Sequence, residues 1–125
     1  MTAAYLWINA IAYAVLAAWC TLMPLQTAKA VGFLELSASG RAEYAAIYGG
    51  LQAGLAFLFG WTALAGQHRF GLMLALALYA PIIVFRGIAI ARHGPVGTTT
   101  LALATIEVVL LVTAVLLWRR LSPMA

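Results

Sequence analysis

Four long runs of apolar residues decide which folds are open to this chain. They cover approximately residues 4–23, 42–65, 70–91 and 98–118. Each run is about 20 residues long, enough for an α-helix to cross the roughly 30 Å hydrocarbon core of a bilayer. The 125 residues are 66% hydrophobic and 8% charged, which is too apolar for a soluble domain. We therefore predict an all-α polytopic membrane protein, a compact antiparallel four-helix bundle in one domain (1–125).

Prolines and glycines mark the ends of the predicted helices. Pro24 ends the first helix, Gly66 ends the second, and Pro81 predicts a kink within the third. The breaks GQHR and RHGPVG are so short that the helices on either side must run antiparallel. The longer break, residues 24–40, contains VGFLEL, which we expect to lie flat at the membrane interface.

The charged residues are few and indicate topology. The net charge of +4 comes mostly from the ends of the apolar runs, so it does not predict a nucleic-acid surface. An even number of helices places both termini on one side. Arg69, Arg119 and Arg120 favour that side as cytoplasmic, whereas Lys29, Arg41 and Arg92 lie on the other side and weaken the bias. The stretch TAKA (27–30) resembles a signal-peptidase site. The run before it lacks basic residues and is too long for a signal peptide, so we expect the first helix to be retained.

Two ionisable residues are predicted to lie inside the membrane. Glu107 is about 14 Å and Arg86 about 9 Å from the same surface, because a helix rises 1.5 Å per residue. One tight loop joins their helices, and an unpaired charge at such depth costs at least about 2.5–3.5 kcal/mol. We predict an Arg86–Glu107 ion pair, which either locks the two helices together or serves a ligand or a reaction.

The second predicted helix begins with GRAEYAAIYGGLQAG, which is unusually polar for a membrane span. Arg41, Tyr48 and Gln52 are spaced seven and four residues apart and share one helical face. Gln52 is expected at about the depth of Glu107. Arg41 and Glu43 also fit a simpler interpretation, in which they anchor the interface and complement the helix dipole.

Small residues occupy roughly the opposite face of this helix. Ala46, Gly50 and Gly54 form a stripe that is predicted to let another helix approach closely. Further polar residues fall at helical spacing on the other helices. They are Tyr79, Arg86 and His93 on the third, Thr100 and Glu107 on the fourth, and Tyr5, Asn9, Tyr13 and Cys20 on the first.

No established catalytic, nucleotide-binding or metal-binding motif occurs in the sequence. His68 and His93 are predicted in loops on opposite sides of the membrane, so they do not share a metal. The single cysteine, Cys20, excludes an intrachain disulfide and is expected to be a small packed side chain. No cofactor and no metal ion are therefore predicted.

The motif GRAEYAAIYGGLQAG resembles a family of small four-helix bacterial membrane proteins, domain of unknown function four-three-four-five. Arg86-Gly87 in the third helix and Glu107 in the fourth also look like that family. The resemblance would cover nearly the whole chain and implies a four-helix fold in the bacterial inner membrane, with no assigned reaction. The layout is more distantly similar to the DoxX-like group of membrane proteins.

These features predict a protein that binds a small amphipathic or lipid-like molecule in the non-cytoplasmic half of the bundle. The pocket would be built from Tyr48, Gln52, Arg86 and Glu107, with Arg41 and Glu43 at its mouth. Arg86 would hold an anionic or carbonyl head group, and Glu107 would orient Arg86.

Two other functions stay open at this point. One is a membrane enzyme of the isomerase or cyclase type, with Glu107 or Glu43 as general acid or base. The other is a non-catalytic accessory subunit whose glycine face packs on a second copy or on a larger membrane complex. The bilayer is the one partner expected in every case.

Overall fold

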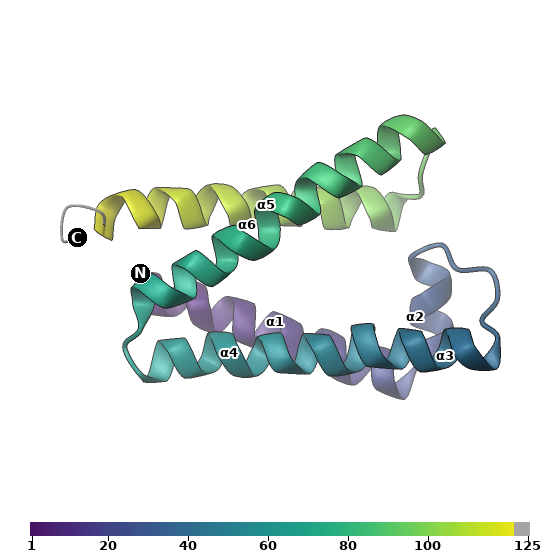
Figure 1. The fold of residues 1–125 in the computed structure, drawn as a ribbon, viewed down its shortest axis with the longest axis horizontal. Coiled ribbons are helices and arrows are strands. Elements are labelled where there is room, and N and C mark those ends of the chain that lie inside the picture. The colour runs from purple at the N-terminus through teal and green to yellow at the C-terminus, as the bar shows by residue number, and fades with distance from the viewer. Residues whose placement is uncertain (122–125) are drawn as a thin grey trace. The chain divides into compact units, whose positions relative to one another are not determined.

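The computed structural model describes residues 1–121, and these residues are all-helical, with no strand. Figure 1 shows α1 (Thr2–Leu22), α2 (Pro24–Ala30), α3 (Ala38–Tyr44), α4 (Gln52–Leu64), α5 (His68–His93) and α6 (Thr98–Leu121). A π-helical segment, η1 (Ala45–Leu51), joins α3 to α4. Four helical stretches are long and apolar enough to cross a membrane: α1, Ala38–Leu64, α5 and α6. The predicted fold class, an all-α polytopic membrane protein with four spanning helices, is confirmed.

The chain divides into two compact units. Residues 3–67 form the N-terminal unit, which contains α1 to α4, and residues 1–2 with the chain from His68 onward form the α5–α6 unit.

Pro24 both ends α1 and begins the next helix. α1 stops at Leu22, and Pro24 takes the first position of α2, where its fixed φ suits a helix and its missing N–H is not needed. The chain then turns at Gly32 (φ +102°), and residues 33–37 have no regular structure. The helix in this break is therefore α2, which lies before the VGFLEL stretch.

The second spanning helix starts four residues earlier than predicted, at Ala38. Ser37 caps it, because the Ser37 hydroxyl accepts a hydrogen bond of 3.0 Å from the Gly40 N–H. Arg41 therefore lies inside the helix. η1, which covers AAIYGGL, has π-helical hydrogen bonds that reach carbonyls five residues back, so side chains beyond it are rotated from their α-helical positions.

Gly66 ends this helix as predicted. Gly66 adopts φ +69°, a left-handed backbone conformation that glycine adopts more readily than other residues. The Gln67 N–H donates to the Thr62 carbonyl at 2.9 Å. The Gly66 N–H donates to the Ala63 carbonyl at 3.4 Å. These two bonds form a Schellman motif, which satisfies carbonyl groups at the helix end and turns the chain sharply.

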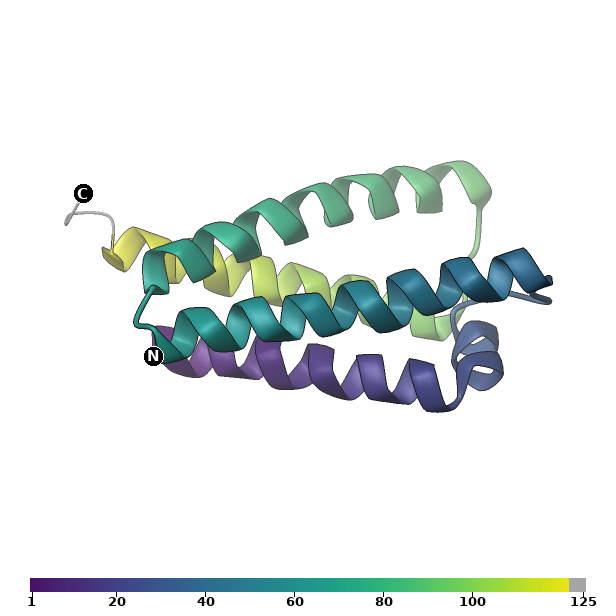
Figure 2. The ribbon, with the colours of Figure 1, turned by 60° about the horizontal axis from the view of Figure 1, so that its bottom comes forward.

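In the N-terminal unit, α1 runs alongside the long helix formed by α3, η1 and α4 (Figure 2). The rings of Tyr13 and Phe59 stack in parallel with centroids 6.0 Å apart. At Gly60, an added Cβ would lie 3.7 Å from the Trp7 ring, and at Gly49 it would lie 2.9 Å from the Thr21 hydroxyl. Close approach between these helices therefore occurs at Gly49 and Gly60.

The predicted small-residue stripe does not take part in this packing. Ala46, Gly50 and Gly54 are exposed, and a Cβ added at Gly50 or Gly54 would meet no atom within 4 Å. Within the N-terminal unit, α1 docks on the face of Gly49 and Gly60 instead. Close approach of another helix to the stripe stays a prediction.

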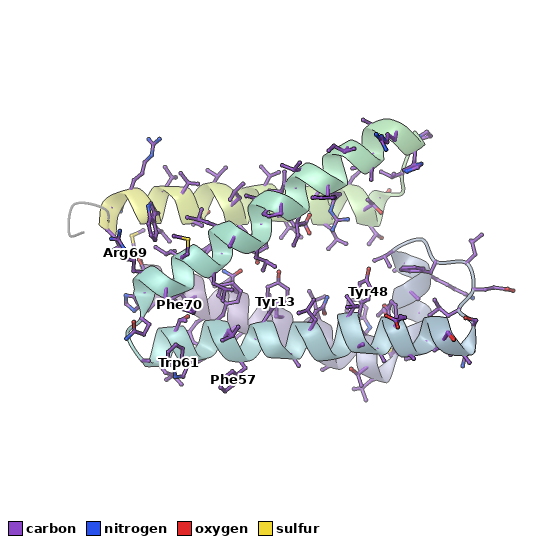
Figure 3. The ribbon with its side chains drawn as sticks, in the orientation of Figure 1. Tyr13, Tyr48, Phe57, Trp61, Arg69 and Phe70 are labelled. Carbon is purple, nitrogen blue, oxygen red and sulfur yellow. The ribbon has the colours of Figure 1, made fainter. Side chains whose placement is uncertain are left out.

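In the α5–α6 unit, α6 returns antiparallel along α5 after a turn at Gly94 (φ +80°), as Figures 1 and 2 show. Pro81 lies inside α5 without ending it. At the other end of the pair, the guanidinium of Arg69, labelled in Figure 3, lies 4.6 Å from the centre of the Trp118 ring. This cation–π contact and the short turn hold both ends of the hairpin together.

Candidate functional site

A salt bridge joins Arg86 on α5 to Glu107 on α6. Arg86 Nε donates to Glu107 Oε1 at 2.7 Å, and Arg86 Nη2 donates to Glu107 Oε2 at 2.9 Å. The two parallel bonds form a bidentate pair, the geometry in which arginine binds carboxylates most firmly. The predicted ion pair is confirmed. The antiparallel hairpin brings together residues that are 21 positions apart in sequence.

Arg86 also lines a pocket of about 580 Å³ on the α5–α6 unit. His93 and Thr100 line it too, together with apolar side chains that include Ile82, Phe85 and Ile90. Arg86 and His93 share this pocket because seven residues are about two helical turns, and the hairpin turn brings Thr100 beside them. The arginine side chain keeps 30% of its surface exposed, whereas Glu107 keeps 14%.

This arrangement suits recognition of an anionic or carbonyl group. The guanidinium is a permanent cation with planar donor geometry, and Glu107 fixes its orientation through both carboxylate oxygens. The aliphatic and aromatic walls of the pocket suit an apolar tail. The pocket thus combines one oriented cation with an apolar lining, as small-molecule sites commonly do.

A second cluster lies in the N-terminal unit and is aromatic. The rings of Tyr44 and Tyr48 stack with centroids 4.4 Å apart and planes 14° apart. Phe33, from the turn before α3, meets Tyr44 edge-on at 6.0 Å and Tyr48 edge-on at 6.4 Å. Figure 3 shows Tyr48 on the side of its helix where α2 lies. Three rings from two segments therefore form one cluster.

Hydrogen bonds fix the buried tyrosine of this cluster. The Tyr44 hydroxyl donates to Thr27 Oγ1 on α2 at 2.7 Å, and Thr27 Oγ1 donates to the Met23 carbonyl at 2.9 Å. Tyr44 is 4% exposed and packs with Cys20 and Ala28. Cys20 is thus a packed side chain, as predicted, and α2 is held against the start of the second spanning helix.

The aromatic cluster borders a pocket of about 260 Å³. Its lining includes Phe33, Leu36, Glu43, Tyr44, Ile47 and Tyr48. Glu43 lies on the exposed side of α3, one residue before Tyr44.

The predicted site residues fall into three groups. Glu43 and Tyr48 line the pocket of the N-terminal unit, and Arg86 pairs with Glu107 in the α5–α6 unit. Arg41 is exposed on α3 and lines neither pocket. Gln52 also lines neither pocket. A single pocket formed by all six residues stays a prediction.

Gln52 has an unusual environment. Its side-chain oxygen, Oε1, is buried and accepts no hydrogen bond within residues 1–121. A buried amide oxygen without a donor costs free energy, so such groups are rare in folded proteins.

Tyr44, Thr27 and Phe33 were not expected from the sequence. Tyr44 precedes Tyr48 by four residues, a spacing at which two rings on one helix can meet, so the pair was detectable. Phe33 and Thr27 carry no such signal, because they come from α2 and the turn after it. No pattern in the sequence indicated the π-helical segment either, although such segments are frequent at functional sites.

Comparison with family models, with curated proteins and with solved structures found no match for this chain. The resemblance to the family of small four-helix membrane proteins therefore stays a prediction.

Proposed function

We propose that this membrane protein binds a small amphipathic molecule at the α5–α6 hairpin, with its anionic or carbonyl head group on Arg86. The observation that carries the proposal is the bidentate Arg86–Glu107 pair, which lies within two spanning helices and whose arginine lines a pocket of about 580 Å³. Ionisable residues at such positions mark binding or transport sites more often than not.

The surroundings of the pair support a ligand more than a purely structural lock. A structural ion pair needs only its two partners, yet His93 and Thr100 gather in the same pocket as Arg86. The remaining lining is apolar, which suits the tail of a lipid-like molecule. Arg86 keeps 30% of its side-chain surface exposed, so a head group can still reach it.

The same contacts favour binding over acid–base catalysis by Glu107. Both of its oxygens accept hydrogen bonds from Arg86, which suits a residue that orients the guanidinium. Accessory packing on a partner through Gly50 and Gly54 stays compatible with a binding role, because these glycines lie in the other unit and are exposed.

We also propose the bacterial inner membrane as the location, with both termini cytoplasmic and this pocket in the non-cytoplasmic half. The support is the placement of Arg69 near the start of α5 and of Arg119 and Arg120 near the end of α6. Basic residues at span ends favour the cytoplasmic side.

Mass spectrometry of molecules that co-purify with the gently solubilised protein tests the proposed function. We expect an amphipathic molecule with an anionic or carbonyl head in the wild type, and its loss from the double variant Arg86→Met, Glu107→Gln. Arg92→Gln serves as the matched control, because Arg92 lies on the same helix but does not line the pocket. A folded double variant with undiminished ligand content would refute the proposal.

A further inference from the structure

The polar side chains of the α5–α6 hairpin lie at two levels. Arg86 and Glu107 form the salt bridge, whereas His93 and Thr100 line the Arg86 pocket nearer the turn. Seven residues separate Arg86 from His93 on α5, and seven separate Thr100 from Glu107 on α6. Because the two helices are antiparallel and rise 1.5 Å per residue, the two levels are about 10 Å apart along the hairpin.

Apolar side chains separate these two levels. Ala89 and Ile90 line the pocket between Arg86 and His93. The lining residues of α5 recur every three or four positions from Ile82 to His93, so they form one continuous face of the helix. Past Arg86, the lining reaches only about 6 Å further from the turn, to Ile82, so most of its length lies between the two polar levels.

The hydroxyl of Thr100 differs from those of two other threonines on α6. Thr105 and Thr113 donate to the carbonyl groups four residues back, at 2.9 and 2.8 Å. Thr100 is the third residue of α6, so the residue four positions back, Val96, lies in the turn outside the helix. Within residues 1–121, Thr100 makes no such bond. Its hydroxyl is therefore available to donate to a ligand or to accept from one.

We propose that the ligand of this pocket has a polar group at each end, an inference that rests on the proposed function. Its anionic or carbonyl head lies on Arg86, and a hydroxyl or carbonyl group at the other end lies between His93 and Thr100. An apolar chain passes Ala89 and Ile90 and joins the two ends. An extended chain advances about 1.2 Å per bond, so about eight bonds cover the 10 Å.

A chain that ends in a methyl group fits this lining less well. It would displace water from His93 and Thr100 without replacing the hydrogen bonds, which lowers affinity. A second carboxylate also fits less well, because no lysine or arginine of the described chain except Arg86 lines the pocket. A neutral hydroxyl both donates and accepts, as the side chains of Thr100 and His93 do. The ligand class is therefore a medium-chain acid or ketone with a hydroxyl or carbonyl at its far end.

Calorimetric titration of the full-length protein in a maltoside detergent, corrected for binding to protein-free micelles, tests this inference. The probe is ω-hydroxyoctanoate, and the control ligand is octanoate, which lacks only the terminal hydroxyl. We expect the hydroxy acid to bind roughly threefold to tenfold more tightly, the usual contribution of a hydrogen bond. Equal binding of the two acids, or no binding of ω-hydroxyoctanoate, would overturn the inference.

A shorter pair of acids tests the distance between the two levels. The chain of ω-hydroxybutanoate is too short to reach both Arg86 and Thr100, so we expect it to bind no more tightly than butanoate. A gain as large as that of the longer pair would mean that the hydroxyl acts independently of the 10 Å spacing. That result contradicts a ligand held at both ends.

Substitutions assign the preference to the level near the turn. In the double variant His93→Leu, Thr100→Val, we expect octanoate to bind as before and the preference for the hydroxy acid to disappear. Thr105→Val is the matched control, because the Thr105 hydroxyl donates to the Leu101 carbonyl and Thr105 does not line the pocket. It should keep the preference. A preference that persists in the double variant would show that His93 and Thr100 do not hold the second polar group.

The double variant Arg86→Met, Glu107→Gln separates this inference from the proposed function. We expect it to lose binding of both octanoate and ω-hydroxyoctanoate. If the wild type binds the two acids equally and this variant binds neither, the proposed function stands and the second polar group is wrong. If this variant binds the hydroxy acid as tightly as the wild type does, the head group does not lie on Arg86, and the proposed function fails too.

Discussion

The hydroxyl oxygen of Thr21 on α1 lies 2.9 Å from the position that a Cβ on Gly49 would occupy. Cβ atoms do not tolerate such a distance, so Gly49→Ala forces Thr21 or the helices to shift. Thr21 is β-branched, so its χ1 angle in a helix is restricted to two main rotamers, and the clash favours a change from one to the other. We expect Gly49→Ala to be less stable than Gly50→Ala by roughly 0.5–1.5 kcal/mol, the cost of an unfavourable rotamer.

Thermal unfolding in detergent measures this difference. Gly50→Ala is a close control, because Gly50 is in the same π-helical segment and a Cβ there meets nothing within 4 Å. Adding Thr21→Ala to Gly49→Ala should restore stability by removing the clash. Equal stability of the two glycine variants would show that α1 does not pack closely at Gly49.

The Arg86–Glu107 pair predicts a strongly non-additive mutant cycle. Removing one partner of a buried pair leaves a charge without compensation, at a cost of about 3–5 kcal/mol, and less here because Arg86 is 30% exposed. Arg86→Met and Glu107→Gln should each lower the melting temperature. The double variant should recover much of the loss, because neutral side chains replace an ion pair at little cost. Additive losses would mean that the two side chains are not coupled.

The hydrogen bond from Tyr44 to Thr27 predicts that removing its acceptor costs more stability than removing its donor. Tyr44→Phe removes the donor but leaves Thr27 bonded to the Met23 carbonyl, so we expect a loss of about 0.5–1.5 kcal/mol. Thr27→Val strands the hydroxyl of Tyr44, which is 4% exposed, and should cost about 1–3 kcal/mol. Chemical denaturation of the purified variants gives both values. A larger loss for Tyr44→Phe would contradict this account.

The proposed orientation predicts where reporter fusions are active. Fusions at Gly66 and after Leu121 should report a cytoplasmic location, and a fusion at Ser37 should report the periplasm. Each site lies at the end of a spanning helix, outside the apolar segment. A periplasmic signal from the fusion after Leu121 would reverse the orientation and place the Arg86 pocket in the cytoplasmic half.

The sequence alone determined where the four long helices lie and which two charged side chains within them form a pair. A bilayer offers no hydrogen-bond partners, so every long apolar run must be helical, and four such runs are present. The end of the second spanning helix at Gly66 was predictable because glycine readily adopts a positive φ. The Arg86–Glu107 pair followed from depth and a short loop, because two opposite charges near one membrane level have few other partners.

Only the tertiary structure decided which faces of these helices meet. Hydropathy showed no preference among the small residues of AAIYGGLQAG, yet α1 packs at Gly49, while Gly50 and Gly54 stay exposed. The π-helical segment, the short helix α2 and the contacts of Phe33 with Tyr44 and Tyr48 also escaped prediction. The physical reason is that helix formation in a membrane is local, whereas packing depends on side-chain shape between distant segments, where lipid supplies no hydrophobic driving force.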